Sequence, residues 1–217
     1  MAFKNRSDAG KKLADILTQS AKYGADALVL GLPRGGVPVA FEVAKVLKAP
    51  LDVFIVRKLG MPGHEELAMG AIASGGVRVL NPHVIRSHGI AEADIERVVQ
   101  REGRELERRE QLYRGDRLFP DVEARTVILV DDGLATGASM RTAVAALKQR
   151  HPGEIIVAVP TAAPETCAEF QAEVDEVICA ETPQPFYGVG MWYDSFPQTT
   201  DEEVHELLER SRASRTA

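Results

Sequence analysis

Short apolar runs alternate with helical patterns along most of the chain, and this alternation constrains the fold more than any other feature. The runs are ALVLGL (27–32), LDVFIVRK (51–58), TVILV (126–130), EIIVAVP (154–160) and DEVICA (175–180). Continuous apolar runs of this length are typical of strands that are covered on both faces. Strands and helices in alternation predict an α/β fold with a doubly wound, mainly parallel sheet.

The segments between these runs are mostly helical in pattern. We expect helices at 7–22, 37–48, 91–114 and 138–150, and two more that begin near Pro164 and Thr200. Between the second and third apolar runs, residues 68–80 predict two short strands around the Gly75-Gly76 turn. The glycines and prolines of residues 59–66 predict an open loop.

The helix predicted at 91–114 is unusually charged. Its apolar residues Ile95, Val99, Leu106 and Tyr113 form only a narrow stripe. A coiled coil or a basic arm is conceivable, but the heptads are poor, so we interpret it as a solvated helix at the edge of the domain. We expect one domain over residues 1–217, with a helical insertion at about 82–118 and a hood formed by about 181–200 and the N-terminus.

Composition excludes several classes of protein. The 217 residues are 45% hydrophobic and 27% charged, and the net charge of −6 disfavours a nucleic-acid binder. No apolar run is long enough to span a membrane, and the N-terminus lacks an apolar signal core, which predicts a cytoplasmic protein. Cys167 and Cys179 are too few for a disulfide framework, so we interpret both as ordinary small hydrophobic residues.

The stretch VILVDDGLATGAS carries the main functional signal. Asp131 and Asp132 follow an apolar strand directly, and the loop Ala135-Thr136-Gly137-Ala138-Ser139 leads into a helix. Small residues before a helix let an anion approach the backbone N–H groups, and Thr136 and Ser139 add hydroxyl donors. The loop is not a Walker P-loop, because no Gly-Lys-Ser/Thr follows its glycine.

The two acids suggest which anion is bound. Carboxylates beside a phosphate site can accept hydrogen bonds from vicinal sugar hydroxyls, or hold Mg²⁺ through water. A helix N-cap would explain one of the two acids, Asp131 or Asp132, but not both. The combination therefore favours a ribose 5-phosphate as the ligand.

These residues resemble the 5-phosphoribosyl diphosphate (PRPP) motif of the type I phosphoribosyltransferases. The motif consists of an apolar strand, two acids and a short loop that contains Thr-Gly. The family usually has Thr at the last loop position, where this chain has Ser139. The resemblance extends over GLPRGGVPVA and VRKLGMPGHEELAMGAIA, and is strongest to bacterial proteins described only as predicted phosphoribosyltransferases.

The resemblance implies roles for individual residues. Asp131 and Asp132 would bind the ribose hydroxyls, and Ala135 to Ser139 would bind the 5-phosphate. The turn with Arg34, Gly35 and Gly36 occupies the place of the diphosphate loop, although a plain strand–helix turn explains it nearly as well. Residues 57–66 match the catalytic lid, with Arg57 and Lys58 beside the leaving group, unless they form an ordinary exposed loop.

The C-terminal segment is similar to that of the purine-salvage members. Phe186, Tyr187 and Trp192 are candidates for stacking on a base, and Asp194 is a candidate for helping to bind Mg²⁺. The lysine that reads the base in those members is absent, because no lysine follows Lys148. The aromatic residues could equally form a hydrophobic patch that closes the hood.

The resemblance implies an enzyme that transfers 5-phosphoribosyl from PRPP to a nitrogenous acceptor with Mg²⁺ as cofactor, and a possible homodimer. Two alternatives remain open, a non-catalytic PRPP-binding regulator and a hydrolase or phosphorylase of ribosyl compounds. A phosphorelay receiver domain is excluded, because EIIVAVP and DEVICA do not end in the required Asp and Lys. The sequence does not identify the acceptor.

Overall fold

The core of the protein is a five-stranded parallel sheet. The computed structural model describes residues 3–19 and 22–216. The strand order is β2-β1-β6-β7-β8, and every pair of neighbours is parallel. The bounds are β1 (Leu28–Gly31), β2 (Leu51–Val53), β6 (Thr126–Val130), β7 (Glu154–Thr161) and β8 (Glu176–Glu181). The predicted α/β class with a mainly parallel sheet is confirmed.

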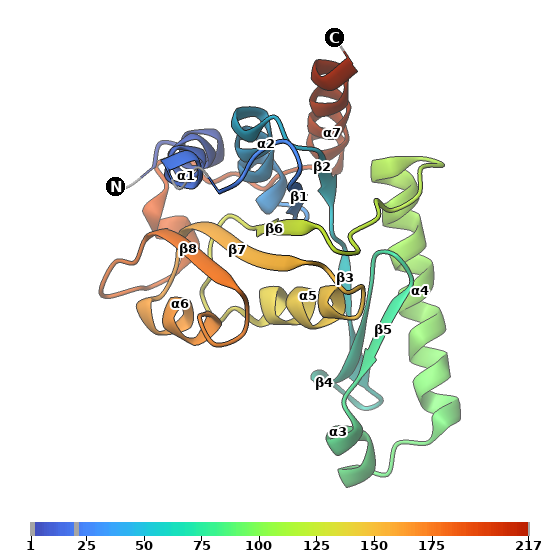
Figure 1. Cartoon of the computed structure of the whole chain (residues 1–217). Helices are drawn as coiled ribbons and strands as arrows, with labels where there is room; N and C mark the ends of the chain where they lie inside the picture. Colours follow the sequence, from blue (N-terminus) through green and yellow to red (C-terminus); the bar gives the residue numbers. More distant parts are fainter. Residues whose placement is uncertain (1–2, 20–21, 217) are drawn as a thin grey trace.

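Helices cover both faces of this sheet (Figure 1). On one face lie α1 (Arg6–Gln19) and α2 (Gly36–Leu47), and on the other lie α5 (Ala138–Lys148) and α6 (Pro164–Phe170). Successive side chains of a strand point to opposite faces, so Val127 packs in the cluster with α5 and α6 while Ile128 packs with α1 and α2. The apolar runs are continuous because both faces are buried.

A second, antiparallel sheet projects from this core (Figure 1). Its strands are β3 (Val56–Met61), β4 (His64–Ala73) and β5 (Val77–Leu80), followed by α3 (Pro82–Ser87) and α4 (Glu92–Arg114). We call residues 56–114 the arm, and the five-stranded sheet with α1, α2, α5, α6 and α7 (Asp201–Thr216) the body.

The arm corrects two predictions. Residues 51–58 were predicted as one strand, but β2 ends at Val53 in the parallel sheet and β3 begins at Val56 in the other sheet. Residues 59–66 were predicted as an open loop, but they form the tip of the β3–β4 hairpin, which turns at Pro62-Gly63. The prediction of two strands around Gly75-Gly76 is confirmed, and both glycines have positive φ, 79° and 76°.

The long charged helix is also present, as α4. Its narrow buried stripe contains Ile95, Val98, Leu106 and Tyr113, which pack against β3, β4 and α7. The rest of the helix is largely solvated, as we interpreted it. The buried stripe of α4 therefore packs against other elements of the same chain.

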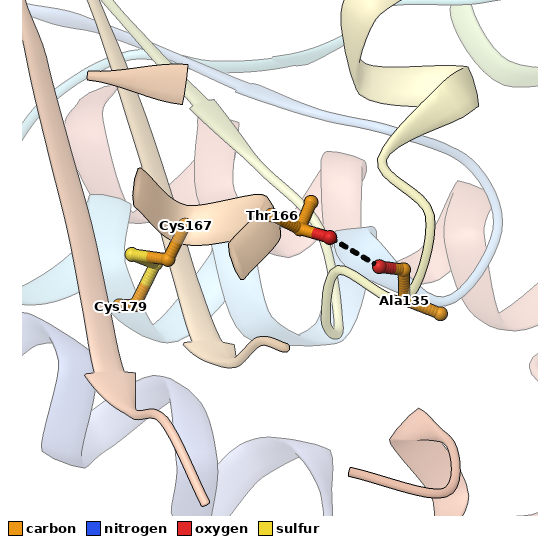
Figure 2. The surroundings of a disulfide bond; sticks show 4 residues. All are labelled: Ala135, Thr166, Cys167 and Cys179. Carbon is orange, nitrogen blue, oxygen red and sulfur yellow. Dashed lines mark hydrogen bonds between the residues drawn. A yellow bond between two sulfur atoms is a disulfide. The ribbon is translucent and has the colours of Figure 1, made fainter. Parts of the chain in front are cut away.

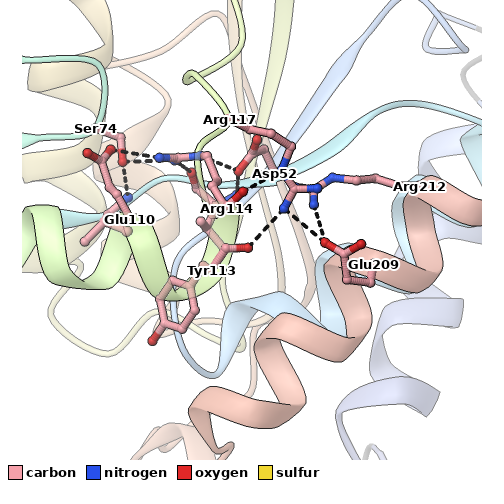
Figure 3. A network of polar contacts seen from close by, with 10 residues as sticks. Asp52, Ser74, Glu110, Tyr113, Arg114, Arg117, Glu209 and Arg212 are labelled. Atoms are coloured by element: carbon pink, nitrogen blue, oxygen red, sulfur yellow. Dashed lines mark hydrogen bonds and ion pairs between the residues drawn. The ribbon is translucent and has the colours of Figure 1, made fainter.

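Arg114, at the end of α4, joins the arm to the body (Figure 3). Its side chain is 2% exposed, and it donates to Asp52 Oδ1 at 2.8 Å, to the Val53 carbonyl at 2.7 Å and to Ser74 Oγ at 3.2 Å. Burial raises the pKa of Asp52, and the charge of Arg114 opposes this shift. Residues from β2, from the end of β4 and from α4 thus meet at one guanidinium.

The predicted hood lies beside the N-terminal segment. Phe3 pairs with Tyr193 through a β-bridge, and these two residues form a small apolar cluster with Ala9. Part of the hood is the short 3-10 helix η1 (Val189–Trp192). Within the described residues, no helix combines the length and the apolar character that crossing a membrane requires.

The two cysteines are bonded to each other, so our interpretation of them as unpaired hydrophobic residues is wrong. Cys167 of α6 and Cys179 of β8 form a disulfide across 12 residues of chain (Figure 2). A single pair at this separation has no sequence signature, and only the packing of α6 on β8 brings the residues together.

Candidate functional site

Most of the residues singled out in the sequence lie at the C-terminal edge of the parallel sheet. There a cavity of about 310 Å³ is lined by Lys58, Asp131, Gly133 to Met140, and Val189. In doubly wound sheets ligands bind at this edge. Larger hollows of about 560 and 580 Å³ lie at the tip of the arm and between α4 and α7. Neither of these is lined by the acid pair or by the loop 135–139.

The acid pair follows β6 directly. Asp131 Oδ1 accepts the backbone N–H of Asp132 at 2.9 Å, and Asp132 Oδ2 accepts from Arg6 Nε and Nη2, both at 2.8 Å. Burial, reinforced by the charge of Asp132, raises the pKa of Asp131 well above its ordinary value. Burial also raises the pKa of Asp132, but Arg6 opposes the shift. Asp132 is therefore the carboxylate that keeps its charge more readily.

Arg6 and Tyr193 support the pair, and sequence reasoning missed both. Arg6 also donates to the Pro197 carbonyl at 2.6 Å, and its guanidinium lies 3.7 Å from the centre of the Phe196 ring. The Tyr193 hydroxyl donates to the Asp132 carbonyl at 2.6 Å. No local pattern could reveal these contacts, because they join α1, the hood and β6 across more than 60 residues.

The turn after β1 packs directly against the acids. A Cβ on Gly35 would lie 2.0 Å from Asp132 Oδ2, and a Cβ on Gly36 would lie 2.6 Å from the Val130 carbonyl. Only glycine fits such close approach. The Pro33–Arg34 peptide bond is cis. The Arg34 side chain does not line the cavity, and its Nη1 lies 3.9 Å from Asp201 Oδ1 at the start of α7.

The loop from Ala135 to Ser139 forms one wall of the cavity and leads into α5. Gly137 has φ of 69°, and a Cβ there would lie 2.6 Å from the Phe170 ring. Thr166 donates its hydroxyl to the Ala135 carbonyl at 2.7 Å, one residue before the disulfide (Figure 2). The loop, the start of the helix and the nearby acids are thus brought together as the sequence predicted.

The two basic residues of β3 point to opposite sides, as alternation along a strand requires. Lys58 lines the cavity with Asp131 and the loop. Arg57 donates through Nε and Nη2 to Glu102 Oε2 of α4, at 2.9 and 2.5 Å. Lys58 is therefore placed to meet a ligand in the cavity, and Arg57 connects β3 to α4.

Comparison of the sequence with known protein families identifies the family of this chain. The family model described as "Phosphoribosyl transferase domain" matches residues 2–194. This chain belongs to that family.

The relatives support the assignment. A Mycobacterium tuberculosis protein named "Putative phosphoribosyl transferase" is 45% identical over 209 residues, which are 96% of this chain and 47% of that protein. The chain thus spans about half the length of this relative. The crystal structure of TT1426 from Thermus thermophilus is 43% identical, with a TM-score of 0.85, and the match covers 97% of this chain and 99% of that one. A uracil phosphoribosyltransferase of Lactobacillus gasseri is 38% identical over 85 residues, 38% of this chain and 40% of that protein.

The phosphoribosyl transferase domain carries its aromatic candidates in the hood. Phe186 and Trp192 stack on each other, with ring centres 6.5 Å apart, and Trp192 packs against the cluster of Phe3 and Tyr193. Tyr187 is 80% exposed. For Trp192 these contacts favour the hydrophobic patch over a role in stacking on a base.

The metal candidate Asp194 is exposed, and its backbone N–H donates to the Phe3 carbonyl at 2.9 Å. In the part of the chain that the structure describes, no three His, Cys, Asp or Glu side chains gather into a metal site. Mg²⁺ usually takes one or two protein carboxylates and completes its shell with substrate phosphates and water. The acid pair beside the cavity fits that mode of binding, and a cage made of protein alone does not.

Proposed function

We propose that the protein transfers the 5-phosphoribosyl group from PRPP to a nitrogenous acceptor and releases diphosphate. The observation that carries this proposal is the single cavity lined by Asp131, the loop 135–139 and Lys58. A ribose 5-phosphate needs hydroxyl acceptors and an anion site a short distance apart, and the acids and the loop offer both.

The reaction follows from the chemistry of these groups. The bond between C1 of the ribose and the diphosphate oxygen breaks. The lone pair of the acceptor nitrogen forms the new bond to C1, and this nitrogen loses a proton. Positive charge develops on the ribose as in glycoside cleavage. No nucleophilic side chain is needed. Mg²⁺, when bound, would neutralise charge on the diphosphate.

The residues of the chain divide the remaining work. The acid pair would fix the ribose, with Arg6 keeping Asp132 ionised so that it can accept from a hydroxyl. The loop would hold the 5-phosphate. Lys58 would stabilise the departing diphosphate as negative charge develops on it, and the Gly35-Gly36 turn would let the backbone approach it closely.

Calorimetric titration of PRPP with Mg²⁺ tests the proposal. We expect the wild type to bind and the Asp131→Asn/Asp132→Asn variant to lose binding. The matched control is Asp15→Asn/Asp26→Asn, two exposed acids of the body, which should bind as the wild type does. No binding by the wild type, or undiminished binding by the acid-pair variant, would contradict the assignment.

The second candidate is a regulator that binds PRPP without turnover. Lys58 in the cavity favours an enzyme over a regulator, because a cation beside the leaving group contributes more to the reaction than to binding of PRPP. A screen of purine and pyrimidine bases for diphosphate release separates the two. Release with any base supports the enzyme, and binding without release across the whole panel supports the regulator.

A further inference from the structure

The carbonyl groups of the loop 135–139 are held from behind. The Ala135 carbonyl accepts from Thr166 Oγ1 at 2.7 Å, and the Thr136 carbonyl accepts from Arg141 Nη1 at 2.8 Å. The Gly137 carbonyl accepts the backbone N–H of Arg141 at 2.8 Å. Three consecutive peptide groups thus have their oxygens fixed by α5 and α6.

This fixes the N–H groups as well. In a planar trans peptide the C=O and the following N–H point in opposite directions. Holding the carbonyls of residues 135–137 therefore turns the N–H groups of residues 136–138 to the other side. The N–H groups of Thr136 and Gly137 have no acceptor among the residues that the structure describes, and Ala138 N lies 3.5 Å from Thr136 Oγ1. These are the donors that a phosphate needs.

The groups behind the loop are themselves well held. Thr166 is 8% exposed, and Phe170 is 0% exposed beneath Gly137. Arg141 Nε donates to Glu173 Oε1 at 2.8 Å, Nη2 donates to Glu169, and the guanidinium lies 4.8 Å from the centre of the Phe170 ring. These contacts leave Arg141 little freedom to reach a ligand itself.

We propose that Thr166 and Arg141 are positioning residues that aim the loop amides at the 5-phosphate. This inference rests on the proposed function and deepens it. Neither residue lines the cavity. Thr166 acts through the Ala135 carbonyl, and the Arg141 side chain acts through the Thr136 carbonyl.

Two ligands separate positioning from general damage. Ribose 5-phosphate uses the loop, and inorganic diphosphate uses the Gly35-Gly36 turn and Lys58. In the variant Thr166→Val we expect ribose 5-phosphate to bind about 10-fold more weakly, the effect of one lost hydrogen bond. Diphosphate should bind as before. Thr166→Ser restores the hydroxyl and should restore binding of ribose 5-phosphate.

Thr18→Val is the matched control, because the Thr18 hydroxyl also donates to backbone carbonyls, Ala14 at 3.0 Å and Asp15 at 2.9 Å, but within α1. It should leave both affinities unchanged. Arg141→Gln provides a second variant should Thr166→Val not fold, and it should show the same selective loss.

The outcomes distinguish the two proposals. If the wild type binds neither ligand, the phosphoribosyl function fails and the positioning role with it. If the wild type binds both ligands, and the folded variants keep full affinity for ribose 5-phosphate or lose both ligands equally, only the positioning role is overturned.

Discussion

The body and the arm are stabilised in different ways. In the body, β6 and β7 are buried along nearly their whole length, and helices cover both faces. In the arm, the first four residues of β4, His64 to Leu67, are exposed, and all the buried residues of this strand lie in its second half. A buried parallel sheet stabilises itself through continuous apolar contact, whereas the arm depends on α4 and on the junction at Arg114.

The candidate site uses both regions. The acids and the loop come from the body, and Lys58 comes from the arm. The geometry between the proposed ribose site and Lys58 is therefore set by the junction of the two sheets. The proposed binding residues thus lie in the more deeply buried region, and the residue proposed to act on the leaving group lies in the less buried one.

Breaking the junction should have the largest effect. Arg114→Met leaves Asp52 buried without its partner, and we expect a loss of about 3–5 kcal/mol in the free energy of unfolding. Denaturant titration measures it. The control is Arg97→Met on the same helix, whose side chain is 73% exposed and should cost at most about 0.5 kcal/mol. Equal losses in the two variants would contradict the role of Arg114.

The disulfide should stabilise the body by less. Cys167→Ser/Cys179→Ser opens a cross-link across 12 residues, which predicts a loss of about 2–3 kcal/mol in the free energy of unfolding. Reducing the wild type with a dithiol should lower its melting temperature equally. The double variant should not respond to the dithiol. A wild type that is equally insensitive to the dithiol would speak against the bond.

Lys58 sharpens the comparison between binding and chemistry. Lys58→Gln should slow turnover about 10- to 100-fold, because it removes charge beside the leaving group, and should weaken PRPP binding much less. Arg57→Gln is the natural control. Arg57 is the neighbour of Lys58 on β3, but its side chain contacts Glu102 and does not line the cavity. Steady-state kinetics and calorimetry together measure both effects. Unchanged turnover in Lys58→Gln would contradict the proposed role of Lys58 at the leaving group.

Asp131 should have the smallest effect on the free energy of unfolding, and this effect depends on pH. The pKa of Asp131 in the folded protein lies above its ordinary value of 3.8. Protonated Asp131 therefore contributes its whole stabilisation of the folded state at a pH below 3.8. This stability is lost as the pH rises through the raised pKa. Asp131→Asn does not titrate, so it should be more stable than the wild type at pH 8, where the buried charge of Asp131 opposes folding. The gain should vanish near pH 3.5.

Chemical unfolding at the two pH values tests this prediction. A gain that is the same at both would show that the charge of Asp131 does not oppose folding. Asp15→Asn, an exposed acid of α1, should be neutral at both.

The sequence predicts the body better than the arm. Its strands are apolar on both faces, and a continuous run such as TVILV has few other structures open to it. In contrast, LDVFIVRK reads as one strand because nothing local shows that the chain changes sheets between Val53 and Val56. What holds the two pieces is Arg114, which bonds Asp52 from 62 residues away.

The candidate site shows the same division. The acids and the loop could be found because they are contiguous and their order has chemical meaning. The contacts that support them, from Arg6, Thr166 and Arg141, are made by ordinary residue types at no fixed spacing. Glycine could be recognised in the turn, but the direction of the Arg34 side chain toward Asp201 could not.

The loop whose carbonyls are held from behind has a consequence for how this sequence can evolve. If peptide N–H groups bind the phosphate as proposed, they place little demand on the side chains of Ala135 or Ala138, and drift there should be tolerated. The demand would fall on positions 166 and 141, which do not line the cavity, and on Gly137, which has no space for a Cβ. Substitutions that change the loop backbone should therefore arise together with changes in α6, and a comparison of diverged copies should find these positions varying as a group.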